Sequence, residues 1–176
     1  RGPARPRWDA AGQVMGKQPT SVIRALAAVA IEPTADPVPA LVPYVMLDPK
    51  PLARSTIKHG VEAARAAVQL SAPGHAVRVT FNAQVLAGGQ SNAMLALLVE
   101  DGRDDCVHAH VVPSLSRVGH EAAPSALGFV FQHRPGRQAV TYSVRVGVDH
   151  GAVRFFSGFE GVSAGALLID EICSEG

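Results

Sequence analysis

Two histidines one residue apart, His108 and His110, have the spacing that most directly indicates metal chemistry in this chain. On a β-strand, side chains at positions i and i+2 point to the same face, about 7 Å apart along the strand. If three copies of the chain place this strand near a common axis, six imidazoles can surround one transition-metal ion in an octahedral arrangement. The competing interpretation is that both histidines point to solvent, opposite inward Val107, Ala109 and Val111.

Two other groups of residues match chemical motifs but lack the context that the chemistry needs. The run Gly161-Val-Ser163-Ala-Gly165 has the form of a hydrolase nucleophile elbow. That elbow requires a helix after the serine and a histidine later in the chain, whereas the last histidine here is His150. An acidic turn offers oxygen ligands for calcium, but it lacks the spacing of a calcium-binding loop and is expected to be solvated. Its residues are Glu100, Asp101, Asp104 and Asp105. We therefore expect a protein that is not an enzyme.

The elements that position these residues are predicted to be β-strands. The clearest covers 140–148, where valine or tyrosine at every even position predicts a half-buried strand. Asp149-His150-Gly151 follows it, which predicts a β-hairpin with a short strand at 153–157. Apolar runs separated by turn residues recur after Gly74. Eight strands are expected in total, at 66–71, 77–85, 93–100, 107–112, 127–132, 140–148, 153–157 and 166–173.

Two segments before Gly74 can form either a helix or a strand. Residues 20–31 combine the potential helix cap Thr20-Ser21 with β-branched residues. Residues 60–70 contain four alanines, which favour a helix by propensity, although 67–71 can also begin the first strand. Between these segments, the prolines from Pro33 to Pro51 predict an extended connector outside any sheet interior.

The first 20 residues are rich in basic residues, proline and glycine, which predicts an extended arm. In this arm we expect Arg5, Arg7 and Trp8 to dock on a partner, with Trp8 as the anchor. The alternative is a linker without a docking role. We divide the chain into an arm with a Pro-rich connector at 1–50 and a β-sandwich at 51–176. Since the chain begins with arginine rather than methionine, we expect a piece of a longer or processed polypeptide.

Two of the predicted strands, 93–100 and 166–173, are apolar on both faces. In an antiparallel sheet only one face of a strand usually meets the domain core, so the second face needs another cover. A neighbouring subunit is the simplest cover, and the alternative is the N-terminal segment folding back over that face. The residues expected at the oligomer interface are Met94, Leu95, Leu97, Leu98, Leu168 and Ile172.

Composition limits the classes of partner. A net charge of +1 over 176 residues argues against a nucleic-acid-binding surface. No run reaches the roughly 18 apolar residues of a membrane helix, so no membrane span is expected. Cys106 and Cys173 are too few for a disulfide framework. We expect buried thiols, with a disulfide between them as the alternative.

A more specific pattern lies in the order of several turn and strand residues over about 66–176. They are Asp101-Gly102, Pro135-Gly136, Thr141 to Val146, Phe155-Phe156 and Leu167 to Ile172. In this order they resemble the jelly-roll, tumour-necrosis-factor-like head domains of phage fibres and other virion proteins. Eight strands is also the number in a two-sheet jelly roll. The resemblance implies a homotrimeric, non-enzymatic domain at the exposed part of a virion, in contact with host surface glycan.

We therefore expect an all-β protein, an antiparallel eight-stranded jelly-roll sandwich preceded by an extended arm, acting as a structural virion protein. A phage tail fibre, a spike, or a capsid or tail accessory subunit assembled in the host cytoplasm fits this description. The arm is expected to attach to other virion proteins. No cofactor is expected apart from a transition metal at a trimer axis. Two alternatives stay open: a carbohydrate-binding module of a larger protein, and a metal-dependent cupin-like enzyme using His108 and His110.

Overall fold

The computed structural model describes residues 21–42, 60–88, 91, 93–113 and 124–174. This part of the chain is all-β with antiparallel sheets, which confirms the expected fold class at that level. It contains ten strands rather than eight: β1 (Ser21–Ile31), β2 (Val38–Pro39), β3 (Val61–Gln69), β4 (Ala76–Gly88), β5 (Ala93–Glu100), β6 (His108–Pro113), β7 (Ser125–His133), β8 (Ala139–Val148), β9 (Ala152–Phe155) and β10 (Gly165–Ser174). Within these residues, no helix is long and apolar enough to cross a membrane.

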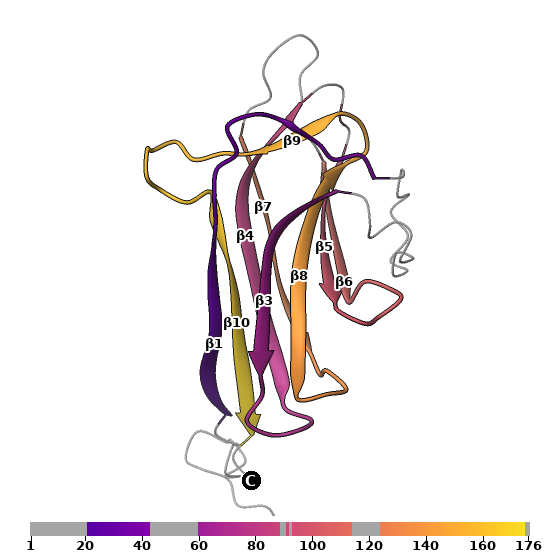
Figure 1. Ribbon diagram of the computed structural model, residues 1–176, viewed down its shortest axis with the longest axis vertical. Helices are drawn as coiled ribbons and strands as arrows, with labels where there is room; N and C mark the ends of the chain where they lie inside the picture. The colour runs from indigo at the N-terminus through magenta and orange to yellow at the C-terminus, as the bar shows by residue number, and fades with distance from the viewer. Residues whose placement is uncertain (1–20, 43–59, 89–90, 92, 114–123, 175–176) are drawn as a thin grey trace, which may run out of the picture.

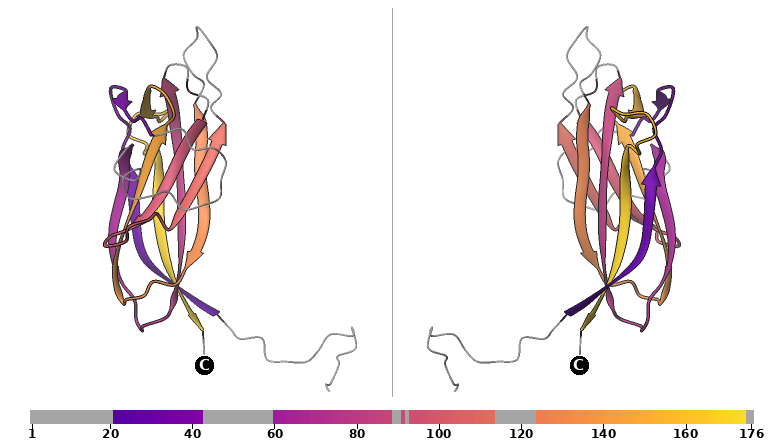
Figure 2. Two further views of the ribbon diagram at one scale, coloured as in Figure 1. Left: turned by 90° about the vertical axis from the view of Figure 1, so that its right-hand side faces the viewer. Right: turned by 90° about the vertical axis from the view of Figure 1, so that its left-hand side faces the viewer.

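The strands form two sheets that face each other as a sandwich (Figure 1; Figure 2). The larger sheet has the order β1-β10-β4, with β7 also paired to β4. Beyond the start of β10, the short strand β9 pairs with the end of β4, and β2 pairs with β9. The smaller sheet has the order β3-β8-β5-β6. Every one of these strands therefore has a hydrogen-bonded neighbour, and the long strands have one face toward the opposite sheet.

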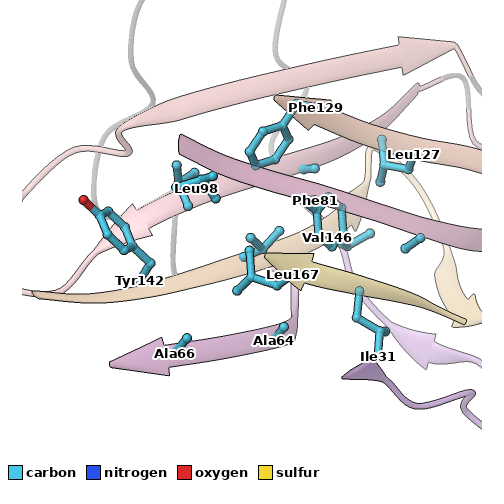
Figure 3. Packing of buried hydrophobic residues seen from close by; sticks show 14 of the residues in the cluster. Ile31, Ala64, Ala66, Phe81, Leu98, Leu127, Phe129, Tyr142, Val146 and Leu167 are labelled. Carbon is cyan, nitrogen blue, oxygen red and sulfur yellow. The ribbon is translucent and has the colours of Figure 1, made fainter. Parts of the chain in front are cut away.

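Alternating side chains of β4 and β8 fill the space between the sheets. Phe81 of β4 and Tyr142 and Val146 of β8 are at most 1% exposed. Figure 3 shows these side chains together with Leu98 and Leu167 from neighbouring strands. Full burial of side chains of this size stabilises a fold by about 1.5–3 kcal/mol each. The period of two predicted for 140–148 is confirmed.

The predicted hairpin between 140–148 and 153–157 is wrong. β8 pairs with β3 and β5 in the smaller sheet, whereas β9 pairs with β4 and β2 in the larger sheet. Gly151, with a φ of +95°, does turn the chain, but the turn carries it from one sheet to the other. Alternating apolar residues identify a strand, whereas a turn residue identifies a reversal of the chain. Neither specifies which strand the next one will pair with.

Both ambiguous N-terminal segments are strands. Residues 20–31 include β1, which pairs with β10, and residues 60–70 include β3, which pairs with β8. In β3, Ala64, Ala66 and Val68 point into the core and are 6–7% exposed. The helical preference of alanine is under about 1 kcal/mol per residue, so pairing and burial outweigh it.

The expected division near residue 50 differs from the structure, because residues 21–42 belong to the sandwich. β1 lies along β10, and the residues after β1 cross the end of the sandwich beside β9 (Figure 1). There the N–H of Thr34 donates to Phe155 O at 3.0 Å, and the N–H of Val42 donates to Val148 O at 3.0 Å. Prolines in this connector lack donors, but the residues between them supply enough hydrogen bonds to attach it to both sheets. The predicted docking residues Arg5, Arg7 and Trp8 lie outside the described residues.

Strand β5 carries apolar side chains on both faces, and residues of the same chain cover both of them. Met94 and Leu98 are 0% exposed and face the core between the sheets. Leu95 and Leu97 point to the opposite face, are 1% exposed, and form a second apolar cluster with Val42, Ala109 and Val111. The fold-back alternative therefore accounts for β5, since Val42 follows β2. These four leucine and methionine side chains are not free to form an oligomer interface in this conformation.

Strand β10 retains an outward apolar face. Leu167 and Ile169 are fully buried in the core, whereas Leu168 is 37% exposed on the outer face of the larger sheet. Ile172 is half-buried on that same face, opposite Ile23 of β1. Of the six predicted interface residues, these two are the ones that a second molecule can still reach.

Candidate functional site

Charged residues gather at one end of the sandwich, in a cross-strand row of the larger sheet. Arg24 in β1 lies opposite Glu171 in β10. Glu171 in turn lies opposite Val77 in β4, and Val77 lies opposite His133 in β7. Directly paired residues point to the same face of an antiparallel sheet, and both Glu171 and Val77 are 0% exposed. The row therefore faces inward, toward the smaller sheet.

The carboxylate of Glu171 is surrounded by hydrogen-bond donors. Its Oε1 accepts from the Ser71 N–H at 2.8 Å and from the Ser71 hydroxyl at 2.7 Å, and it lies 2.7 Å from His75 Nδ1. Its Oε2 accepts from Nε of Arg24 at 2.8 Å, with Nη2 at 2.6 Å. Because an ionised carboxylate only accepts, Nδ1 of His75 carries the proton in this arrangement.

The turn between β3 and β4 brings Ser71 and His75 to this carboxylate. It carries the chain from the smaller sheet to the larger one and contains Pro73-Gly74, with Gly74 at a φ of +79°. Glycine adopts this left-handed conformation without a steric penalty, so the chain can close tightly over the end of the core. The turn thus supplies the hydrogen-bond donors of Ser71 and His75, while Arg24 supplies donors from the neighbouring strand β1.

Opposing effects set the pKa of Glu171. Burial alone would raise this pKa, because a charged carboxylate is costly away from water. Hydrogen bonds from the Ser71 hydroxyl, His75, the Ser71 N–H and Arg24 act in the other direction, and together they lower the pKa to about 2. The buried carboxylate is therefore ionised at neutral pH.

A thiol completes this cluster, which we call the Glu171 cluster: Arg24, Ser71, His75, Glu171 and Cys173. Cys173 is two residues after Glu171 on β10, so both side chains point to the same face, and its Sγ lies 3.9 Å from Ser71 Oγ. The donor atoms of His75, Glu171 and Cys173 all lie within 4.8 Å of one another. In the part of the chain that the structure describes, this is the one group of three such side chains close enough to share a metal ion.

A second buried acid lies in the same end of the core. Glu100 at the end of β5 is 4% exposed, and its Oε2 lies 2.9 Å from Nε2 of His133. This contact joins the smaller sheet to the larger one. Nε of Arg137 lies 3.8 Å from the other oxygen of Glu100. Two His–Glu pairs from four different segments thus occupy one layer of the sandwich.

Tyr142 lies beside this second pair. It is opposite Glu100 across β5 and β8, and its ring is 6.1 Å from that of His133 in an edge-on arrangement. Burial first, and then the negative charge of Glu100, raise the pKa of Tyr142 far above its ordinary value. The buried hydroxyl has no hydrogen-bond partner among the described residues. It is therefore a neutral and poorly satisfied group.

His108 and His110 lie on β6 as expected, but they face the interior. They pair with Leu98 and Ala96, which point into the core. The His108 ring stacks on Phe131 with centroids 4.5 Å apart and meets Phe129 edge-on at 5.0 Å. Burial first, and then the charge of His110, lower the pKa of His108. Within the described segments, no third ligand joins the two histidines. The strand pairing and the ring contacts of His108 contradict the interpretation that both point outward.

The acidic side chains of the turn after β5 contact different partners. Asp101 forms an ion pair with Arg65 at 2.7 Å, and Asp105 forms one with Arg103 at 3.1 Å. Glu100 points into the core instead of into the turn. The oxygens of Glu100, Asp101 and Asp105 therefore do not converge on one point, as calcium would require, and Asp101 and Asp105 form ion pairs at the surface.

No protein-family model matches this chain, and no curated protein matches its sequence. Function has to be inferred from the fold and from the clusters described above.

The Glu171 cluster was not predicted from the sequence, although the sequence contains one signal for it. In the segment Leu167 to Cys173, the odd positions share a face, and Leu167 and Ile169 belong to the core. An acid at position 171 is therefore a charge at an inward position, which requires buried partners. Those partners could not be named, because they lie 96 to 147 residues away in sequence.

Proposed function

We propose that this chain is a structural subunit of a virion, a jelly-roll protein that assembles as a trimer through the outer face of its larger sheet. The observation that carries the proposal is the nested pairing of its long strands. β1 pairs with β10, β3 with β8, β4 with β7, and β5 with β6. First-with-last pairing of this kind fits an eight-stranded jelly roll, with β1 and β2 counted as one interrupted strand and β9 and β10 as another.

The outer face of the larger sheet supports self-association. One row across four strands consists of Ala28, Leu168, Thr80 and Val130, and the next consists of Ala30, Ala166, Asn82 and Gly128. Neither row contains a charged side chain. Val130 is 65% exposed and Leu168 is 37% exposed. These two uncharged rows span four strands and expose Val130 and Leu168 among small residues, which fits a second sheet better than it fits water.

The proposals of a trimer and of a virion rest on the resemblance to phage-fibre head domains. The uncharged rows of the sheet face support the choice of this face as the interface. Leu168 and Ile172 stay in the proposed interface, and Val130 replaces the residues of β5. Arg5, Arg7 and Trp8 stay the proposed contacts with other virion proteins. Contact with host glycan is a further part of the proposal. We assign no glycan-binding residues for it among the described segments.

Light scattering on the purified chain tests this assembly. A trimer is expected at about 55 kDa, three times the chain mass of 18.3 kDa. Val130→Lys and Leu168→Lys place charges in the same row of the face and are each expected to give a monomer. Phe159→Lys is the matched control, because Phe159 is 77% exposed in the loop before β10, away from this row. A wild-type monomer, or Lys variants that keep the trimer, would overturn the proposal.

A further inference from the structure

We propose that His75, Glu171 and Cys173 bind one zinc ion at the end of the sandwich. The donor set is an imidazole nitrogen, a carboxylate oxygen and a thiolate sulfur. Zinc accepts all three kinds of ligand, whereas magnesium and calcium require oxygen ligands. This site is independent of the proposed trimer, because each chain contributes all three ligands.

Small movements of the side chains convert the observed arrangement into a zinc site. Tetrahedral zinc with bonds near 2.1 Å keeps its ligand atoms about 3.4 Å apart. The three donor atoms already lie within 4.8 Å of one another. His75 Nδ1 and Glu171 Oε1, now 2.7 Å apart, have to separate by less than about 1 Å, and the Cys173 sulfur has to move toward them. His75 and Cys173 are only partly buried, so their side chains have room for this adjustment and the ion has a route from solvent.

The protons and charges balance. Zinc replaces the proton on Nδ1 of His75, which moves to Nε2 in the other neutral tautomer, and the Cys173 thiol releases its proton to solvent. The thiolate and the carboxylate together offset the two charges of the ion. Three protein ligands leave the fourth position to water.

Residues outside the ligand set already orient the carboxylate. Arg24 holds Oε2 through Nε at 2.8 Å, which leaves Oε1 on the side of His75 and Cys173. The Ser71 N–H and hydroxyl donate to Oε1 from the turn. Hydrogen bonds of this kind fix ligand orientation in zinc sites and contribute to affinity. The turn between β3 and β4 and the end of β10 would thus be joined by the ion.

Cobalt and zinc titrations of the chelator-treated full chain test the site. Co²⁺ is expected to bind one per chain and to show a thiolate-to-cobalt charge-transfer absorption, which Zn²⁺ then removes by displacement. Cys173→Ser is expected to abolish this absorption and to weaken zinc binding by about 100-fold or more. Cys106→Ala and His110→Ala are the matched controls and should leave both unchanged, since neither residue is in the site.

Circular dichroism of each variant establishes that it is folded; Cys173 and His75 lie at partly exposed positions, so loss of the fold is not expected. His75→Gln provides a second test that keeps the thiol and should lower zinc affinity to a similar extent. The proposal is overturned if the wild type shows no charge-transfer absorption at one cobalt per chain, or if the absorption persists in Cys173→Ser. The trimer mass is measured separately, so failure of one proposal leaves the other standing.

Discussion

In the inward-facing row of the larger sheet, Nη2 of Arg24 lies 2.6 Å from Oε2 of Glu171, its cross-strand neighbour. The two partners differ in their access to water, because the Arg24 side chain is 49% exposed and that of Glu171 is 0% exposed. Loss of the contact therefore affects them unequally. A freed guanidinium can be solvated, whereas a freed Oε2 cannot.

Arg24→Met is expected to lower the free energy of unfolding by about 2–3 kcal/mol, because it leaves one oxygen of a buried carboxylate without a donor. Methionine retains most of the apolar stem of arginine, so packing changes little. Chemical denaturation at neutral pH measures the effect. Arg65→Met is the matched control. Arg65 pairs with Glu62 and Asp101 at the surface, so its loss should cost less than about 1 kcal/mol. Equal losses in the two variants would contradict this prediction.

Glu171 is also expected to make the protein sensitive to acid. Unfolded, its carboxyl has an ordinary pKa of 4.5, whereas the folded protein holds that pKa at about 2. As pH falls between these values, the unfolded state binds a proton that the folded state does not, so stability decreases. The contribution is present above about pH 4.5 and is lost toward pH 2. Unfolding free energies measured from pH 5 to 2 should decline less steeply in Glu171→Gln. An unchanged slope would show that other carboxyls cause the acid sensitivity.

Tyr142→Phe is expected to leave stability unchanged or to raise it by up to about 1 kcal/mol. The substitution removes a buried hydroxyl that has no partner among the described residues and keeps the ring. Tyr142→Ala, in contrast, empties a fully buried position and should cost about 3–5 kcal/mol. Thermal and chemical unfolding of both variants measure the difference. A clear loss of stability in Tyr142→Phe would indicate that the hydroxyl has a hydrogen-bond partner.

Gly165→Ala is expected to destabilise the larger sheet by about 1–3 kcal/mol, as overpacking does in other cores. A Cβ at the start of β10 would meet the carbonyl oxygen of Asn82 and lie 2.7 Å from Cα of Ala83, and both are backbone atoms that cannot rotate away. Gly136→Ala is the control, because a Cβ there has no atom within 4 Å. Denaturation midpoints should fall in the first variant and stay within error in the second.

Local patterns in the sequence determined where most of the strands lie. The alternation in 140–148 predicted which side chains are buried, because the side-chain period of a strand is a property of the backbone alone. The turns at Asp101-Gly102 and at Gly151 were also predicted, since glycine accepts the positive φ found at both. All-β character and antiparallel sheets follow from such short-range signals.

Tertiary structure decided the pairing, the cover of each face and the composition of the charged cluster. β9 joins the larger sheet instead of forming a hairpin with β8, and Val42 covers Leu95 and Leu97 in place of a second subunit. Glu171 acquires Arg24 and His75 from distant segments. Each of these outcomes depends on which strands meet across the sandwich. That choice is driven by the burial of apolar side chains between the two sheets, and no local period encodes it.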